Sequence, residues 1–419
     1  VLGSRGLGDV YKRQMYLHRT VEKIFLELSS RFKVVMLSGM RQVGKSTTLM
    51  NLKEPSRGYV TLENLDAQAL ARNAPKAFFE EHELPITIDE IQRAPNLFLT
   101  IKLLVDREET KGGVWLSGSQ KFELMKGVGD SLAGRIYPQQ LMPLSLYERA
   151  GKGLEQEPYV PDPQKKAGLP YEDADRIWDI IWQGGWPGAL ELGPEERNRY
   201  FNAFITTFLE KDVAGIWNVG KLAAYQRFMQ GLALRTGQEL RIGQLALIAG
   251  VDESTAKRWL SIAEASGLVY LLRPLSGNSG KTLTKSPKVY MTDVGLAAFL
   301  CRKRTPAELE SDMNSDAFFE TFVITEILKS WVHNGRVPDF YFYRDPKRQK
   351  TIDLIIHHEG CWHPVEIKSV KTPHLEMARN FAVLDKMGLN RGLGAIICNM
   401  VEKKRFLSDD VIAHSIFEI

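Results

Sequence analysis

The chain has 419 residues, too many for one ordinary hydrophobic core, and this length favours two or three domains. Its composition, 44% hydrophobic and 25% charged, is typical of a soluble globular protein. The 55 basic and 51 acidic residues leave a formal charge of +4, which permits contact with nucleic acid but is too small to require it.

The cysteines and the apolar runs exclude two further classes of protein. Cys301, Cys361 and Cys398 are widely spaced and form no CxxC pair, so neither a disulfide framework nor a thiolate zinc site is indicated. No apolar run reaches the roughly 18 to 20 residues of a membrane span, and the start lacks the apolar core of a signal peptide. We therefore expect a cytoplasmic protein without a membrane partner.

The first 14 residues, VLGSRGLGDVYKRQ, precede Met15 and show neither helical nor strand periodicity. We interpret residues 1–14 as a non-native leader whose basic side chains have no binding role. A P-loop ATPase domain is then expected over residues 15–150.

That domain is predicted from the segment FKVVMLSGMRQVGKSTTL at 32–49, which reads as an apolar strand, a glycine-bearing loop and a helix. It contains G-x-x-x-x-G-K-[ST], a pattern in which main-chain N–H groups surround phosphate oxygens at the start of a helix. In this pattern the lysine reaches the β- and γ-phosphates of ATP and the next residue holds Mg²⁺. The alternative is a glycine-rich turn without a ligand. The residues predicted to contact ATP are Gly39, Arg41, Gln42, Val43, Gly44, Lys45, Ser46 and Thr47.

A second strand, LPITIDEIQ at 84–92, ends in Asp89 and Glu90. An acidic pair after a strand is usually a solvated turn, but at this distance behind a P-loop it is typical of a Walker B motif. Ser46 is then predicted to hold Mg²⁺, Asp89 to position the same ion through water, and Glu90 to polarise the attacking water. A third strand, GVWLSGSQ at 113–120, ends in Ser119 and Gln120, either of which would sense the γ-phosphate unless it only forms a turn.

Arg135 lies in the next segment, SLAGRIYPQQLMPLSLYE at 131–148. An arginine at this point either completes the ATP site of a neighbouring subunit, which would require a homo-oligomer, or faces solvent.

Several motifs together resemble those of one family: GMRQVGKST, ITIDEIQ, LSGSQ, SLAGR with MPLSLYE, GGWPGAL and KVYMTDVGLAAFL. They are similar to motifs of the large family of bacterial and archaeal AAA-like ATPases that carry a C-terminal domain of unknown function. The resemblance runs from about Met15 to the C-terminus. It implies ATP binding and a multidomain P-loop architecture, and it implies no particular biological role.

The middle of the chain reads as a linker followed by two helical units. Residues 151–176 are rich in Pro, Gly and charge, which is typical of a linker. Residues 177–220 have helical spacing interrupted at GGWPG, which predicts a helical lid. Residues 221–290 contain a helix, a Gly-centred turn, a second helix from about Asp252 and a strand, which predicts a winged-helix domain.

The winged helix is open to two interpretations. Its second helix presents Glu253, Ser254, Lys257 and Arg258, and the basic segment 276–288 resembles a wing that would lie along a phosphate backbone. A structural or protein-binding module with an exposed hairpin tip has the same features.

The tail, residues 291–419, follows the order αβββαβ, with a helix at 316–332, strands at 339–344, 351–358 and 362–370, a helix at 374–387 and a strand at 394–400. This order resembles the core of PD-(D/E)xK restriction-endonuclease-like α/β domains. The resemblance places Asp353, Glu366 and Lys368 in the signature positions, and Glu320, on the helix at 316–332, is a candidate further metal ligand. Carboxylate oxygens suit Mg²⁺, and a nearby ammonium can orient water. The alternative is an inactive nuclease fold in which these residues form an ion-pair network.

The sequence as a whole predicts a multidomain α/β protein that binds ATP and Mg²⁺. It is interpreted as an ATPase whose nucleotide cycle controls the winged-helix and nuclease-like modules, with DNA or another nucleic acid as a candidate partner. The alternative is a nucleotide-gated DNA- or protein-binding switch with negligible turnover.

Overall fold

The computed structural model describes residues 16–107, 110–118, 132, 134–164, 168–169, 175–208, 222–275, 286–345, 350–400 and 405–419. The interpreted leader, Ser119, Gln120 and most of the wing at 276–288 lie outside these residues.

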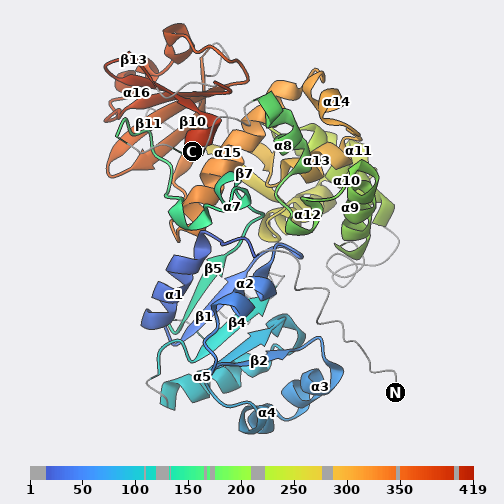
Figure 1. Cartoon of the computed structure of the whole chain (residues 1–419). Helices are drawn as coiled ribbons and strands as arrows, with labels where there is room; N and C mark the ends of the chain where they lie inside the picture. Colours follow the sequence, from blue (N-terminus) through green and yellow to red (C-terminus); the bar gives the residue numbers. More distant parts are fainter. Residues whose placement is uncertain are drawn as a thin grey trace.

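The first part of the chain folds into a five-stranded sheet with all strands parallel, in the order β2-β3-β4-β1-β5. It forms the lower half of the molecule in Figure 1. Strand β1 is buried on both faces: Val34 and Met36 pack in one core, and Val35 and Leu37 in the other. This two-sided burial follows from the crossover helices, because α1 and α2 contribute to one core while α3, α4 and α5 contribute to the other. The elements are α1 (Val21–Arg31), β1 (Val34–Ser38), α2 (Lys45–Leu52), β2 (Gly58–Thr61), α3 (Leu65–Asn73), α4 (Pro75–Glu81), β3 (Ile86–Asp89), the 3₁₀ helix η3 (Ile91–Arg93), α5 (Leu97–Arg107), β4 (Val114–Gly118) and β5 (Ile136–Gln140).

The middle of the chain is mainly helical. The predicted lid corresponds to α8 and α9, and the predicted pair of helices is α11 and α12, joined by a turn with Gly250 at φ +71°. Asp252 caps α12 by accepting a hydrogen bond from the N–H of Thr255. The elements are α7 (Leu146–Arg149), η4 (Gly153–Glu155), α8 (Ile177–Gln183), η6 (Pro187–Ala189), α9 (Pro194–Phe208), α10 (Leu222–Leu234), β6 (Gln238–Glu239), α11 (Ile242–Ala249), α12 (Glu253–Ala265), β7 (Val269–Pro274), β8 (Lys288–Met291), α13 (Val294–Leu300) and α14 (Pro306–Glu310).

The tail contains the expected elements in the expected order, with two differences. The helix predicted at 374–387 is a 3₁₀ turn and a short helix, and Asn380 between them donates to the carbonyl of Thr351, which ties this segment to β10. Two strands, β13 and β14, follow β12 and were not predicted. The elements are α15 (Ser315–His333), β9 (Phe340–Arg344), β10 (Thr351–His358), β11 (Cys361–Lys368), η9 (Leu375–Ala378), α16 (Ala382–Lys386), β12 (Gly394–Cys398), β13 (Arg405–Ser408), β14 (Val411–Ser415) and η10 (Ile416–Glu418).

One nine-stranded sheet joins the two domains that were predicted to meet at residue 290. Its order is β13-β14-β12-β11-β10-β9-β7-β8-β6, and the joint is the parallel pairing of β7 with β9. Arg273 is opposite Tyr341 and Pro274 is opposite Phe342. The predicted boundary at residue 290 therefore does not separate two sheets. The strands β6, β8 and β7 continue into the strands of the tail through the pairing of β7 with β9.

The described part of the predicted linker 151–176 is packed against the tail rather than free. Tyr159 is fully buried, its N–H donates to the hydroxyl of Ser330, and its carbonyl accepts from Trp331. Leu169 donates to the carbonyl of Phe417. α15 and the C-terminus thus satisfy backbone groups of Tyr159 and Leu169, which composition could not indicate.

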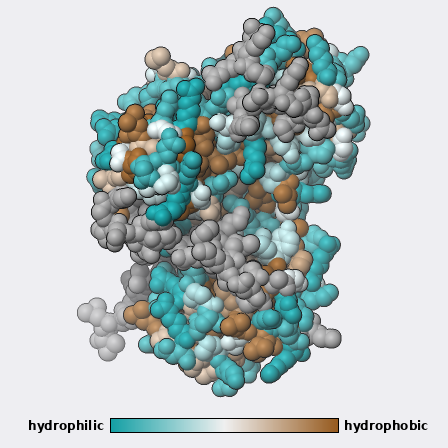
Figure 2. Space-filling model, turned by 180° about the vertical axis from the view of Figure 1, so that it is seen from behind, coloured by the Kyte–Doolittle hydropathy of each residue, from teal (hydrophilic) through white to brown (hydrophobic). Residues whose placement is uncertain are grey.

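From behind, the molecule presents a mixed surface, mostly hydrophilic and broken by hydrophobic patches (Figure 2). Among the helices of the described ranges, none combines the length and apolar character needed to cross a membrane.

Candidate functional site

The loop between β1 and α2 has the backbone that a P-loop needs. A Cβ atom at Gly39 would overlap the carbonyl oxygen of Leu141, so this position has room only for glycine. Gly44 precedes α2 with φ +99°, a conformation that glycine adopts without strain. The loop therefore brings its backbone to the start of α2, where N–H groups favour anions.

The two predicted motifs meet at the carboxyl edge of the parallel sheet. Ser46 donates from Oγ to both oxygens of Asp89, at 2.9 and 3.0 Å, although the two residues are 43 positions apart. Asp89 also accepts hydrogen bonds from Tyr59, at 2.9 Å, and from Ser117. A hydroxyl beside a carboxylate is a donor set that suits Mg²⁺, so these residues fit the predicted metal.

Lys45 and Glu90 have defined positions beside this pair. The ammonium of Lys45 donates to the carbonyls of Gly39 and Met40, at 3.1 and 2.7 Å. Glu90 has φ +58°, and its N–H donates to Ser117 at 3.2 Å. Its carboxylate accepts from Gln92.

Sequence reasoning missed Ser117 and Tyr59. Ser117 lies in LSGSQ, the motif from which Ser119 was chosen, and it is fully buried between Asp89 and the N–H of Glu90. Ser117 could have been found from its place near the end of the predicted strand, whereas Tyr59 lies in no motif that would have indicated it. Ser119 itself lies outside the described residues.

Other parts of the chain hold the remaining P-loop residues. Arg19 donates from Nη1 to the carbonyl of Val43 at 2.8 Å, and Trp186 donates from Nε1 to the carbonyl of Arg41 at 3.2 Å. Gln42 has φ +61°, and Gln42 and Thr47 have exposed side chains.

Arg135 is placed at the wrong edge of the sheet to act on its own ATP site. It precedes β5, which pairs in parallel with β1, so it lies near Val34 whereas the P-loop follows Ser38. A five-residue strand separates the two edges by about 16 Å. Arg135 instead pairs with Asp106 at the surface. Arg135 therefore does not reach the ATP site of its own chain, and its role in a neighbouring subunit stays a prediction.

Arg19 connects the P-loop to α15 through two buried groups. Its Nε lies 3.1 Å from Glu148, and Nδ1 of His333, in the last turn of α15, lies 3.1 Å from the same carboxylate. Burial opposes ionisation of Glu148, but Arg19 and His333 hold its pKa well below the usual range. His333 Nε2 also accepts a hydrogen bond from the N–H of Met142, at 3.0 Å.

The motifs GGWPGAL and KVYMTDVGLAAFL form the two sides of one contact. Asp293 accepts a hydrogen bond from the N–H of Gly185 at 2.6 Å, and the N–H of Leu144 donates to the carbonyl of Gly185 at 2.7 Å. A Cβ atom at Gly184 would approach the backbone of Gly295 to 2.8 Å. These glycines allow Trp186 to reach the P-loop from a segment anchored on α13.

The four predicted nuclease-site residues are brought together in the tail. Lys368 lies 2.7 Å from Glu366 and 3.6 Å from Asp353, so Asp353 and Glu366 converge on one ammonium. Glu320, on α15, is linked to this group by Lys288, which was not predicted.

Lys288 lies between two of the carboxylates. Its Nζ is 2.8 Å from Glu320 and 3.9 Å from Asp353, and its side chain is 7% exposed. Tyr290, on the same strand, donates to Glu320 at 2.6 Å. Burial opposes the positive charge of Lys288, but the nearby carboxylates of Glu320 and Asp353 raise the pKa of Lys288 above its ordinary value.

Burial is the main influence on the pKa of the Glu366 carboxyl. Burial raises this pKa to about 7, the nearby Asp353 raises it further, and Lys368 opposes the shift. Its Oε2 is buried without a hydrogen-bond donor among the described residues.

This cluster does not fit a metal ion as it stands. Within the described ranges, no group of three Asp, Glu, His or Cys side chains is placed to hold one. Two ammonium groups occupy the space around the carboxylates, so the arrangement favours the ion-pair alternative over the predicted metal site.

Comparison with known families agrees with the geometry of the first part of the chain. Residues 31–150 match the family model "AAA domain". The N-terminal part carries an AAA-like P-loop domain. Residues 174–307 and 315–417 match two models described as domains of unknown function, DUF8612 and DUF4143. The match in the tail gives no support to the predicted nuclease-like fold.

Two uncharacterized proteins, from Mycobacterium tuberculosis and Mycobacterium bovis, are each 29% identical over 358 residues, covering 85% of this chain and 74% of the relative. Among solved structures, a Walker-type ATPase of Pyrococcus abyssi has a TM-score of 0.41 at 15% identity, covering 69% of this chain and 97% of that one. The RuvB Holliday junction branch migration motor of Thermotoga maritima has a TM-score of 0.29 at 17% identity, covering 64% and 89%. Because both scores lie below 0.5, neither likeness supports a functional statement.

Proposed function

We propose that this protein is a Mg²⁺-dependent ATPase. The observation that carries the proposal is the contact of Ser46 with Asp89, because it joins the P-loop and the second acidic motif at one edge of the sheet. The match of residues 31–150 to the AAA domain supports it.

The chain's own residues would divide the work in a simple way. The loop N–H groups bind the phosphates, and Ser46 and Asp89 hold Mg²⁺, which supplies positive charge beside them. Lys45, whose ammonium donates to the carbonyls of Gly39 and Met40 in this structure, would bind the β- and γ-phosphates of ATP. Glu90 orients the attacking water, and Ser117 fixes both Asp89 and the backbone of Glu90.

Phosphate release by the purified protein tests this proposal. Glu90→Gln should lower turnover about 100-fold or more while preserving affinity for ATP. Lys45→Ala should weaken binding of a fluorescent ATP analogue, and Lys53→Ala, at the other end of α2, is the matched control. Unchanged affinity in Lys45→Ala would refute the P-loop assignment. Binding without turnover in the wild type would favour the nucleotide-gated switch.

The nucleotide state would reach the C-terminal half through the buried contacts of Arg19 and Trp186. Both donate to P-loop carbonyls, and Arg19 shares Glu148 with His333 of α15. We expect ATP to slow amide hydrogen exchange in α15, and we expect this effect to be lost in Arg19→Ala. If amide hydrogen exchange in α15 is the same with and without ATP, the nucleotide state does not reach the C-terminal half through Arg19 and Trp186.

The C-terminal half would act on nucleic acid by binding rather than by cutting. The order α10-β6-α11-α12-β7-β8, with β8 pairing both β6 and β7, supports a winged helix. The αβββαβ order of the tail supports a nuclease-like fold, while Lys288 among its carboxylates supports an inactive one. Cleavage of DNA with Mn²⁺ that disappears in Lys368→Ala would refute the inactive form.

A further inference from the structure

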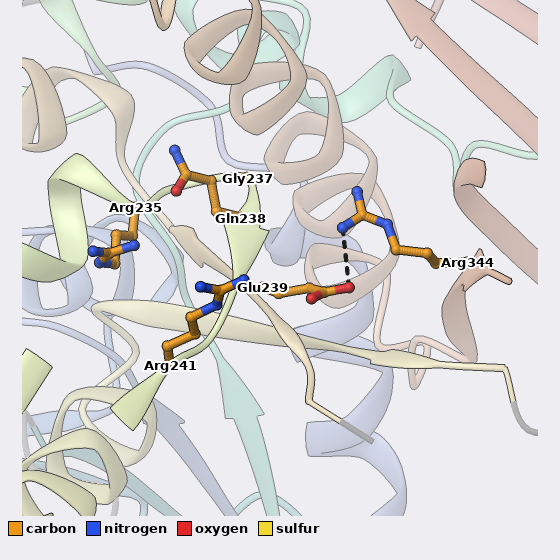
Figure 3. Close-up of a pocket in the computed structure, with 6 residues that line it drawn as sticks. All are labelled: Arg235, Gly237, Gln238, Glu239, Arg241 and Arg344. Atoms are coloured by element: carbon orange, nitrogen blue, oxygen red, sulfur yellow. Dashed lines mark hydrogen bonds and ion pairs between the residues drawn. The ribbon is translucent and has the colours of Figure 1, made fainter. Parts of the chain in front are cut away.

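A cavity of about 330 Å³ lies between residues 235–241, in the middle of the chain, and Arg344 at the end of β9 in the tail. It is next to the carboxylate cluster, because Glu239 in its wall is paired with Lys288 of that cluster in the sheet. Its volume is in the range of small-ligand sites. Figure 3 shows its lining side chains around the short strand β6, with Arg344 reaching across from the end of β9. The lining residues are Arg235, Gly237, Gln238, Glu239, Arg241 and Arg344.

The charge of this cavity is unbalanced. Three arginines face one carboxylate, and that carboxylate, Glu239, already lies 3.0 Å from Nη1 of Arg344. Among the described residues, no acidic side chain pairs with Arg235 or Arg241. The cavity therefore carries a net positive charge that an anion would neutralise.

Two guanidinium groups also have buried N–H donors to satisfy. The Nε atoms of Arg235 and Arg344 are buried, and no hydrogen-bond acceptor for them lies in the described ranges. A buried donor without an acceptor is costly, and a bound oxyanion supplies acceptors in the geometry that guanidinium groups prefer.

The position of the cavity favours a phosphate of a nucleic-acid strand. Arg241 is the residue that precedes α11, the first helix of the predicted helix-turn-helix. In that motif the first helix crosses the nucleic-acid backbone while the second lies in the groove. Glu239, on β6, is opposite Lys288 on β8, so the cavity and the tail cluster occupy adjoining strands.

We propose that this cavity binds a backbone phosphate of DNA, with Arg235, Arg241 and Arg344 as the contacts. The inference rests on the proposed action on nucleic acid and gives that action a site. It differs from the sequence prediction, which placed the contacts on Lys257 and Arg258 of α12. Those two side chains are exposed, but they are the only basic residues of α12, whereas the cavity is lined by three arginines.

Fluorescence anisotropy with a labelled DNA duplex of about 20 base pairs, in EDTA and without ATP, tests the site. The double variant Arg235→Glu with Arg241→Glu should weaken DNA binding about 10-fold or more. The slope of the logarithm of the binding constant against the logarithm of the salt concentration should fall by about the amount expected for two lost phosphate contacts. Two pairs of variants with the same charge change serve as controls: Lys257→Glu with Arg258→Glu on α12, and Arg379→Glu with Lys386→Glu in the tail. Circular dichroism and phosphate release should be unchanged in the cavity variant.

The outcomes separate this inference from the proposed function. DNA binding by the wild type that survives the cavity variant, or that is lost equally in the tail control, overturns the inference alone. A larger loss in the α12 pair likewise moves the site to that helix. If the wild type binds no DNA even at low salt, the nucleic-acid part of the proposed function fails together with the inference.

Discussion

The P-loop site and the tail cluster are built from the same residue types, carboxylates with a lysine close by, yet they differ in the groups that contact their carboxylates. At the P-loop, Asp89 accepts hydrogen bonds from Ser46, while Lys45 donates to the carbonyls of Gly39 and Met40. In the tail, Lys368 and Lys288 lie directly against Glu366 and Glu320.

This difference separates a carboxylate that accepts hydrogen bonds from neutral hydroxyl groups from carboxylates that are paired with ammonium groups. Asp89 receives hydrogen bonds from three hydroxyl groups, of Ser46, Tyr59 and Ser117, which leave its charge intact for a cation. The tail carboxylates are compensated by ammonium groups of the chain itself, and buried charge of this kind is stable only while its partners remain.

Removing Lys288 should have the largest effect. Lys288→Met keeps the side-chain volume but leaves Glu320 and Asp353 buried with less compensation, so we expect a loss of about 3–5 kcal/mol in the free energy of unfolding. Urea denaturation at neutral pH measures it, with the exposed Lys386→Met as the control. A loss no larger than that of the control would show that the tail cluster does not depend on Lys288.

Glu366 should give the tail cluster a pH dependence. Its pKa is raised from the ordinary 4.5 to about 7 in the folded protein. The folded state therefore binds this proton more tightly than the unfolded chain, and stability falls as the pH rises between these two values.

Glu366→Gln should remove that loss and stabilise the protein by about 1–3 kcal/mol at pH 8 relative to wild type, with much less gain at pH 4. Urea denaturation across this pH range checks the expectation, and Glu376→Gln at the surface is the control. A gain that is larger in acid than at pH 8 would contradict it.

Ser117→Ala tests how much the hydroxyl groups around Asp89 contribute. Loss of the hydrogen bonds to Asp89 and Glu90 should cost about 1–2 kcal/mol in the transition state, or roughly 5- to 30-fold in the rate of phosphate release. Thr87→Val is the matched control, because the buried hydroxyl of Thr87, on the same strand as Asp89, has no hydrogen-bond partner among the described residues. Equal rates in the two variants would remove Ser117 from the site.

Arg135→Ala should have the smallest effect. Because Arg135 pairs with Asp106 at the edge of the sheet opposite the P-loop, hydrolysis at low protein concentration should stay within about twofold of wild type. Phosphate release measured over a range of protein concentrations checks this. A defect that appears only as concentration rises would instead assign Arg135 to a neighbouring subunit's site.

The first site could be predicted from the sequence because its signals are local. The P-loop is a contiguous strand, loop and helix, and Asp89 ends a strand of the same parallel sheet, so spacing alone indicated their meeting. The strands and the first helix of the tail were also predicted nearly to their ends, because buried strands and a long buried helix have strong apolar patterns.

The packed segment around Tyr159 and the shared nine-stranded sheet could not be predicted in this way. Composition indicates that a segment lacks periodicity, but it does not indicate which distant donors will satisfy its backbone. Likewise, the pairing of β7 with β9 depends on two strand edges that are far apart in the sequence.

By itself, the sequence determined the strand, loop and helix of the P-loop and the presence of acidic residues and a lysine in the tail, because each lies within a short stretch of chain. Only the tertiary structure decided what surrounds them. It brought Arg19 to the P-loop carbonyl of Val43, and Lys288 from β8 between Glu320 and Asp353. Whether a carboxylate is free for a cation depends on every charge within a few ångströms, and those charges come from strands and helices that no local pattern connects.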